Sequence, residues 1–292
     1  MKIKNLHTKL FLDGGNPAET RELIGLLGFL DGQTTNPTLI AKNPLAQERL
    51  EEGKKFTKEE IFDFYRKVVK ELSLLIPHGS ISIEVYADKD TRHDQMLAQA
   101  REMFSWIPNA HIKFPTTREG IRAARGALAE GMRVNMTLCF SQAQAAAVYV
   151  ATKGAKRGDV FISPFVGRLD DRGENGMDLI KNIIAMYKIG DGHVQVLSAS
   201  MRNMNHFLYA IQLESDIITA PFVLLKEWIQ KGRRAPDSNF VYAASSPQRA
   251  ISYEEHDLLQ NWESFEISHE LTDKGIERFS QDWNSLIALA KK

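Results

Sequence analysis

The residue of this chain whose type and position most suggest chemistry is Lys113, a lysine at the end of a short apolar run. It follows Ala110, His111 and Ile112 and precedes a long alanine-rich helical pattern. A charge at the end of a buried strand costs free energy unless it is paired or used. Burial favours the neutral amine, which can attack a ketone and form a Schiff base, an electron sink for carbon–carbon cleavage. In the alternative, the side chain only reaches out to water.

Two carboxylates end other strand-like runs and suit proton transfer. Asp13 ends the run 9–13 and can take a proton from a substrate hydroxyl. Its alternative role is an Asx turn or cap in the segment that leads into Pro17. Glu84, in the run 80–86, can move protons through a water molecule, and it can also form an ion pair with Lys113. These two roles of Glu84 are compatible.

Amide and hydroxyl groups near other strand ends suit a hydroxyl-rich ligand, although each such group taken alone is more often a satisfied polar group inside a barrel. They are Asn36, Asn135, Thr137 and Ser163. Strand alternation places Asn135 and Thr137 on one face, and Ser163 on the same face as Phe165. The opposite faces are apolar, as packing against outer helices requires. The polar set is therefore expected to point inward near the C-terminal strand ends.

Two arginines follow the sixth and seventh strand-like runs. Arg168 and Arg202, together with Ser200, suit a phosphate clamp, because guanidinium groups bind phosphate oxygens in pairs. The alternative for Arg168 is a local salt bridge to Asp170 or Asp171.

The elements that must position these residues alternate between strand and helix. Strands are expected over 9–13, 28–32, 80–86, 110–114, 132–138, 159–163, 194–200 and 215–219. Helices are expected over 17–27, 57–76, 92–105, 117–130, 141–153, 176–188, 203–213 and 221–231. This alternation predicts a (β/α)8 barrel of the TIM type. A doubly wound open sheet is the structural alternative, without a G-x-G-x-x-G turn to support a dinucleotide site.

Capping patterns and the C-terminal region complete the expected organisation. Thr116 with Glu119, and Ser141 with Gln144, fit capping boxes before two of the helices.

We expect one barrel domain over 1–292, in which 232–292 forms a C-terminal loop and helical extension. Within it, the helical pattern 273–291 has an apolar face that must pack on the barrel, close its mouth or join a neighbouring subunit. A homo-oligomer is therefore expected. The charged stretch 48–60 suits a solvated insertion or helix face.

Composition narrows the class of protein. The chain has 292 residues, of which 43% are hydrophobic and 25% charged, and its net charge is zero. These values suit a globular protein without a bulk field for nucleic acid or membrane. The lone Cys139 cannot form an internal disulfide, no apolar run reaches the roughly 18 residues of a membrane span, and the N-terminus lacks a signal core. We expect a cytoplasmic protein without a metal or cofactor, since no histidine or cysteine spacing matches a metal site.

The sequence resembles the transaldolase family from Asp13 to about Lys226, in five blocks that follow one another in order. Two of them, 31–40 and 112–124, resemble the N-terminal signature and the Schiff-base segment. The others, 135–141, 162–168 and 199–203, are similar to later blocks of the family.

The resemblance implies a class I mechanism on a (β/α)8 barrel that acts on sugar phosphates. Lys113 would form the Schiff base, Glu84 with Thr137 and a water would move protons, and Asp13 would deprotonate the C4 hydroxyl. A three-carbon dihydroxyacetone unit would pass to a second aldehyde. The residues implied to hold that unit are Asn36, Asn135 and Ser163, and those implied to bind phosphate are Arg168, Ser200 and Arg202.

The family also contains fructose-6-phosphate aldolases, which release free dihydroxyacetone. These enzymes are shorter and typically carry tyrosine where this chain has Phe165, and lysine where it has Arg202. Both residues therefore favour a transaldolase. Other readings stay open: an enzyme for another sugar, for example a sulfonated one, or a barrel that binds sugar phosphates without reacting.

Overall fold

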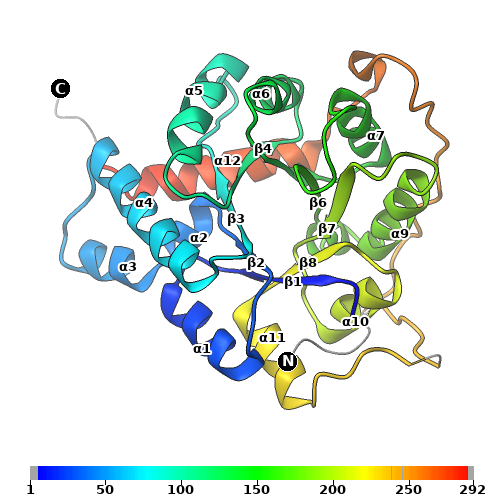
Figure 1. The fold of residues 1–292 in the computed structure, drawn as a ribbon, viewed down its shortest axis with the longest axis horizontal. Coiled ribbons are helices and arrows are strands. Elements are labelled where there is room, and N and C mark those ends of the chain that lie inside the picture. Colours follow the sequence, from blue (N-terminus) through cyan, green and yellow to red (C-terminus); the bar gives the residue numbers. More distant parts are fainter. Residues whose placement is uncertain (1–5, 238, 245, 289–292) are drawn as a thin grey trace.

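In the computed structural model, which describes residues 6–237, 239–244 and 246–288, eight parallel strands form a closed barrel (Figure 1). They are β1 (Lys9–Asp13), β2 (Gly32–Thr34), β3 (Ser80–Glu84), β4 (Ala110–Pro115), β5 (Val134–Cys139), β6 (Val160–Pro164), β7 (Val194–Ser198) and β8 (Ile217–Ala220). Each strand pairs with its neighbour along the chain, and β8 closes onto β1. The predicted (β/α)8 barrel is confirmed, and the open-sheet alternative is wrong.

Helices surround the barrel, because each strand needs its outer face covered. Those near predicted positions are α1 (Pro17–Leu27), α4 (Lys58–Leu75), α5 (His93–Phe104), α6 (Arg118–Ala129), α7 (Gln142–Ala151), α9 (Gly176–Tyr187), α10 (Met204–Gln212) and α11 (Phe222–Gln230). Three further short helices are α2 (Pro37–Ala41), α3 (Pro44–Glu51) and α8 (Val166–Asp170). The charged stretch 48–60 forms the end of α3, the connecting segment and the start of α4, and it is largely exposed to solvent.

The prediction for the second strand was wrong. The apolar run 28–32 suggested it, but β2 starts at Gly32 and runs to Thr34. Gly28 ends α1 instead, with a φ of 88° and its N–H donated to the carbonyl of Ile24. The left-handed backbone at Gly28 cannot continue into a strand. Leu30 is buried, but it lies in the segment between α1 and β2 and not within the strand.

The capping predictions were partly correct. The N-cap of α6 is Thr117, not Thr116, and Glu119 accepts a hydrogen bond from the N–H of His93 in α5 at 2.8 Å. Ser141 caps α7 as predicted, accepting from the N–H of Gln144 at 3.1 Å. The Gln144 side chain does not return to the cap residue; it accepts from the N–H of Phe140 at 2.7 Å.

After α11 the chain runs along the outside of the barrel past α10, α9 and α7 and then returns as α12 (Glu270–Ser285) (Figure 1). The predicted helix 273–291 is thus present but begins earlier and ends at Ser285; its last positions, from 289, lie outside the described residues. Its apolar face buries Phe279 and Trp283 and packs on α2 and β5. No helix in the described part of the chain is long and apolar enough to cross a membrane.

Candidate active site

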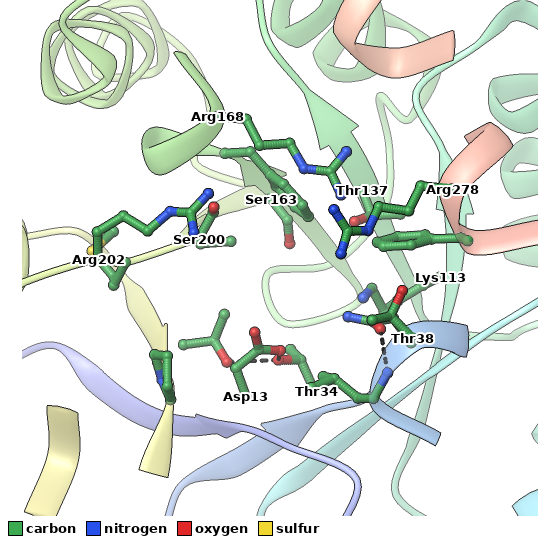
Figure 2. Close-up of a pocket in the computed structure, with 18 of the residues that line it drawn as sticks. Asp13, Thr34, Thr38, Lys113, Thr137, Ser163, Arg168, Ser200, Arg202 and Arg278 are labelled. Carbon is green, nitrogen blue, oxygen red and sulfur yellow. Dashed lines mark hydrogen bonds between the residues drawn. The ribbon is translucent and has the colours of Figure 1, made fainter. Parts of the chain in front are cut away.

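A cavity of about 320 Å³ opens at the C-terminal ends of the strands, beneath α12 (Figure 2). Most of the residues predicted from the sequence line it: Asp13, Asn36, Lys113, Thr137, Ser163, Phe165, Arg168, Ser200 and Arg202. Two predicted residues, Glu84 and Asn135, do not line the cavity and stand behind those that do. Barrel closure therefore brings residues from the whole length of the chain to one mouth.

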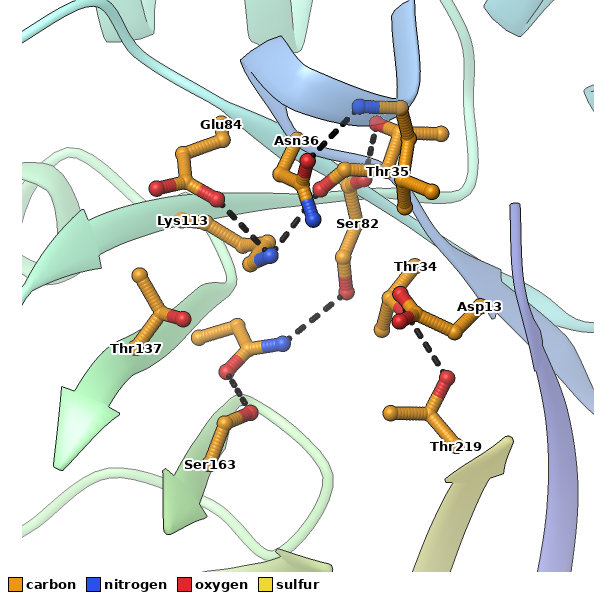
Figure 3. A network of polar contacts seen from close by, with 12 residues as sticks. Asp13, Thr34, Thr35, Asn36, Ser82, Glu84, Lys113, Thr137, Ser163 and Thr219 are labelled. Carbon is orange, nitrogen blue, oxygen red and sulfur yellow. Dashed lines mark hydrogen bonds and ion pairs between the residues drawn. The ribbon is translucent and has the colours of Figure 1, made fainter. Parts of the chain in front are cut away.

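Lys113 projects from β4 into this cavity and is 3% exposed. Its Nζ donates a hydrogen bond to the carbonyl oxygen of Thr35 at 2.9 Å and lies 2.8 Å from Oε2 of Glu84 (Figure 3). The ion pair with Glu84 that the sequence suggested is present. The side chain does not extend to bulk water, so the amine is held in place at the cavity wall.

Glu84, at the end of β3, is placed for proton exchange with Lys113. Burial raises the pKa of its carboxyl group, while the nearby Lys113 opposes this effect. Its backbone N–H donates to the hydroxyl of Tyr65 at 3.0 Å, and that hydroxyl lies within hydrogen-bond distance of Thr35. These bonds fix the ends of β2 and β3 around the lysine. A buried carboxyl group with a raised pKa takes up a proton more readily than an exposed one.

Asp13 ends β1, and its carboxylate accepts a hydrogen bond from the hydroxyl of Thr34 at 2.8 Å. The Thr34 hydroxyl lies 2.6 Å from that of Thr219 on β8 (Figure 3). A hydroxyl has one proton, so when Asp13 is ionised Thr34 donates to it and accepts from Thr219. Burial raises the pKa of Asp13, and Lys113 and the Thr34 bond partly offset this. Asp13 does not act as the helix cap; Asn16 caps α1.

The amide and hydroxyl groups form a ladder across β3, β5 and β6. The Ser163 hydroxyl donates to Oδ1 of Asn135 at 2.7 Å, and Nδ2 of Asn135 donates to Ser82 at 3.1 Å (Figure 3). Toward the cavity Ser163 is therefore left as an acceptor. The buried hydroxyl of Thr137 has no hydrogen-bond partner among the described residues. Asn36 caps α2 through Oδ1, which leaves its amide NH2 for a ligand.

Arg168 does not form the local salt bridge to Asp170 or Asp171 that was the alternative from the sequence. Asp171 pairs with Arg202 at 2.8 Å, and Asp170 pairs with His206 at 2.9 Å, so neither forms a salt bridge with Arg168. The Arg168 guanidinium instead lies over two aromatic rings, 5.6 Å from the centroid of Phe165 and 5.4 Å from that of Phe279. Its burial lowers the pKa of Arg168.

Several residues that line the cavity were not predicted from the sequence, among them Thr34, Thr219, Arg278 and Phe279. Thr34 was missed because the second strand was placed too early in the chain. Its signal was the run Thr34-Thr35-Asn36, which alternates polar groups onto the inner face. Phe279 was part of the predicted apolar helix face, but nothing local in the sequence shows that this helix reaches the barrel mouth. In the structure this helix lies at the barrel mouth, and its apolar face covers part of the cavity.

Comparison with known proteins agrees with this architecture. The family model for Transaldolase/Fructose-6-phosphate aldolase matches residues 10–290. A probable transaldolase of Dehalococcoides mccartyi is 35% identical over 95% of this chain and 99% of its own. Probable transaldolases of Brucella ovis and Alkaliphilus metalliredigens are 34% and 32% identical, over 94% and 96% of this chain and 96% and 99% of their own. The chain belongs to the transaldolase/fructose-6-phosphate aldolase family.

Proposed function

We propose that this protein is a transaldolase that moves a dihydroxyacetone unit from a ketose phosphate to an aldose phosphate through a Schiff base on Lys113. Fructose 6-phosphate and sedoheptulose 7-phosphate are the proposed donors. The observation that supports this most is one buried amine, Lys113, that shares its cavity with the carboxylate of Asp13 and lies 2.8 Å from the carboxylate of Glu84 just behind the cavity wall. A nucleophile with two proton-transfer groups is what Schiff-base chemistry requires.

In the first half of the reaction, Nζ of Lys113 attacks the C2 carbonyl carbon. The carbonyl electron pair moves to oxygen, which takes a proton, and the nitrogen loses one. Glu84 passes these protons with a water molecule held by Thr137, whose hydroxyl has no hydrogen-bond partner among the residues that the structure describes. The C2 hydroxyl then takes a proton from Glu84 through the water and leaves as water, while the nitrogen lone pair forms the C=N bond of an iminium ion on Lys113.

In the second half, Asp13 takes the proton of the C4 hydroxyl. The C4–O bond becomes a carbonyl, and the C3–C4 electron pair moves into the iminium ion to give an enamine. The aldose phosphate departs and a second one enters. The enamine carbon attacks its aldehyde carbon, Asp13 returns the proton, and hydrolysis frees the new ketose and Lys113. The hydrogen bond from Thr34 keeps the Asp13 carboxylate at the cavity wall during these steps.

The remaining predicted residues hold the substrate. Asn36 and Ser163 meet the hydroxyls of the dihydroxyacetone unit, and Asn135 orients Ser163 through a 2.7 Å hydrogen bond. Arg168, Ser200 and Arg202 bind the phosphate group; all three line the cavity. This supports phosphorylated sugars as the substrate class.

Phe165 supports transfer over release of free dihydroxyacetone. Its ring lines the cavity between Arg168 and Phe140 and carries no hydroxyl that could donate a proton to the enamine. An enamine that is not protonated remains able to attack an aldehyde acceptor, as a transferase requires.

Borohydride trapping with fructose 6-phosphate, followed by peptide mass spectrometry, tests the proposal. We expect a dihydroxyacetone-derived adduct on Lys113 and none in Lys113→Met. Addition of an aldose phosphate before borohydride should reduce the adduct. Folded wild-type protein that forms no adduct would contradict the Schiff-base mechanism. An adduct that the acceptor leaves unchanged would contradict the transfer step.

A further inference from the structure

The C-terminal helix contributes two side chains to the cavity. Arg278, labelled in Figure 2, and Phe279 of α12 line it together with the residues of the barrel mouth. Phe279 lies against the guanidinium of Arg168, at 5.4 Å from its ring centroid. The helix thus supplies both a wall and a charge to the end of the cavity where phosphate binding is proposed.

Three guanidinium groups gather at this end. Arg168, Arg202 and Arg278 line the same cavity and extend toward one another in Figure 2. After burial, Arg278 is the next largest cause of the lowered pKa of Arg168, and Arg202 acts in the same direction. Like charges so close together repel one another, and an anion bound between them would offset this repulsion.

The protein neutralises little of this charge by itself. Arg202 is paired with Asp171, but in the described part of the chain the carboxylate within salt-bridge distance of Arg278 is Asp282, at 3.8 Å from Nε. That carboxylate oxygen also accepts a hydrogen bond from Thr38 of α2. The outer nitrogens of Arg278 are therefore available to a ligand, and a phosphate dianion matches the remaining charge.

The helix is held close enough for this role. Gly275 lies against Arg168, so that a methyl group there would come within 2.8 Å of Nη1 of Arg168 and 2.6 Å of Cδ2 of Leu138. Further along the helix, Thr38 binds Asp282, which fixes the turn that carries Arg278. At its N-terminal end, Thr272 donates to the carbonyl of Leu138 at 2.9 Å.

We propose that Arg278 is a third phosphate-binding residue, supplied by α12, and that this helix selects phosphorylated over unphosphorylated sugars. The inference rests on the proposed function in taking the ligand to be a sugar phosphate. It adds a specificity residue from outside the barrel strands and loops. Arg278 contacts only the phosphate group, so it affects binding rather than the chemical step at Lys113.

The test compares Arg278→Ala with Lys274→Ala, which removes an exposed cation one turn earlier that pairs with Glu270 and lies outside the cavity. Binding of inorganic phosphate is measured by calorimetry on the intact enzyme, and KM and kcat are measured for phosphorylated and unphosphorylated donors. We expect Arg278→Ala to weaken phosphate binding and raise KM for fructose 6-phosphate about tenfold, as for one lost charge-assisted hydrogen bond. KM for the unphosphorylated analogue should stay within about twofold.

Arg278→Lys should keep part of the phosphate affinity, and Lys274→Ala should change neither quantity. Unchanged phosphate binding in Arg278→Ala, or an equal rise in KM for both donors, would overturn the inference. The calorimetric measurement needs no turnover. If no adduct forms on Lys113, the proposed reaction fails, while an Arg278-dependent phosphate site still supports this inference.

Discussion

Thr34 shows how one hydroxyl can set the behaviour of the proposed base. It donates a hydrogen bond to Asp13 and, when Asp13 is ionised, accepts one from Thr219. Thr34→Val keeps the shape of the side chain but removes that donor. The ionised form of Asp13 then loses a partner, so its pKa rises further. We expect kcat/KM to fall about tenfold to a hundredfold and the acidic limb of its pH profile to move to higher pH.

Thr34→Ser is the matched control, since it restores the hydroxyl without the methyl group. It should recover most of the activity and return the acidic limb to its original position. If Thr34→Val lowers activity without moving the limb, Thr34 does not act through the ionisation of Asp13.

For Phe165 we propose a different role, in the fate of the enamine. Phe165→Tyr adds a phenolic hydroxyl at the cavity wall and with it a proton donor. We expect free dihydroxyacetone to appear at least several-fold faster when fructose 6-phosphate is supplied without an acceptor. The measurement is a coupled assay for dihydroxyacetone alongside the transfer rate. An unchanged ratio of the two rates would show that this residue does not decide between transfer and release.

For single residues, the alternation of side chains along a strand predicted which of them face the barrel interior. Asn135, Thr137 and Ser163 were expected on inner faces, and they lie at the cavity or directly behind it. Thr219 was not expected, although it lies on β8 with its side chain on Thr34. Its importance arises from closure of β8 onto β1, a contact between the two ends of the barrel that no local pattern records.

At the scale of elements, α12 depends on a glycine for its distance from the barrel. Gly275 leaves no room for a methyl group between the helix, Leu138 and Arg168. We expect Gly275→Ala to push the helix outward, raise KM for phosphorylated donors several-fold and lower the free energy of unfolding. Chemical denaturation and steady-state kinetics measure the two effects.

Gly25→Ala is the matched control, since Gly25 lies within α1 and an added methyl group there would have no neighbour within 4 Å. Alanine at an open helical site should stabilise the fold by about 0.5–1 kcal/mol and leave KM unchanged. Should Gly275→Ala behave like Gly25→Ala, the close approach of α12 would be unimportant.

The presence and order of the helices and strands were more predictable than the residues at which they begin and end. Strand and helix periodicity gave the order of the barrel, because each long segment has a strong pattern of its own. The predicted boundaries were wrong where left-handed backbone interrupts an apolar run. Gly28 ends α1 with a φ of 88°, so β2 begins later than predicted, and Ser200, with a φ of 59°, lies beyond the end of β7. The short helices α2 and α8 were missed since one turn leaves almost no periodicity.

For the whole molecule, the cavity joins β1, β4 and β8 with a helix from the C-terminal region, so the site exists only when the barrel is closed. Its two carboxyl groups, Asp13 and Glu84, are withdrawn from solvent at this junction, whereas the side chains of Arg202 and Arg278 stay more than half exposed. Burial that raises the pKa of Asp13 and Glu84 means that ionising them in the folded protein costs free energy. Keeping these two carboxyl groups ionised at the proposed site therefore lowers the free energy of unfolding.

Asp13→Asn tests that relation. Between the ordinary pKa of 3.8 and its raised folded value, the folded state binds more protons at Asp13 than the unfolded state does. The free energy of unfolding therefore falls as pH rises through this range. Asparagine keeps the oxygen that accepts from Thr34 but never ionises. We expect the variant to lack transfer activity, yet to gain stability over wild type as pH rises from about 4, with the gain levelling above the folded pKa.

The measurement is urea denaturation of both proteins at several pH values, with Asp90→Asn as the control. Asp90 has a side chain that is 77% exposed, so its replacement should give a small difference with no comparable growth with pH. The Asp13→Asn difference should grow because the wild-type protein alone must keep a buried carboxylate ionised. A difference that is constant or shrinks as pH rises would mean that the fold tolerates this charge at no cost, and that Thr34 and Lys113 fully offset its burial.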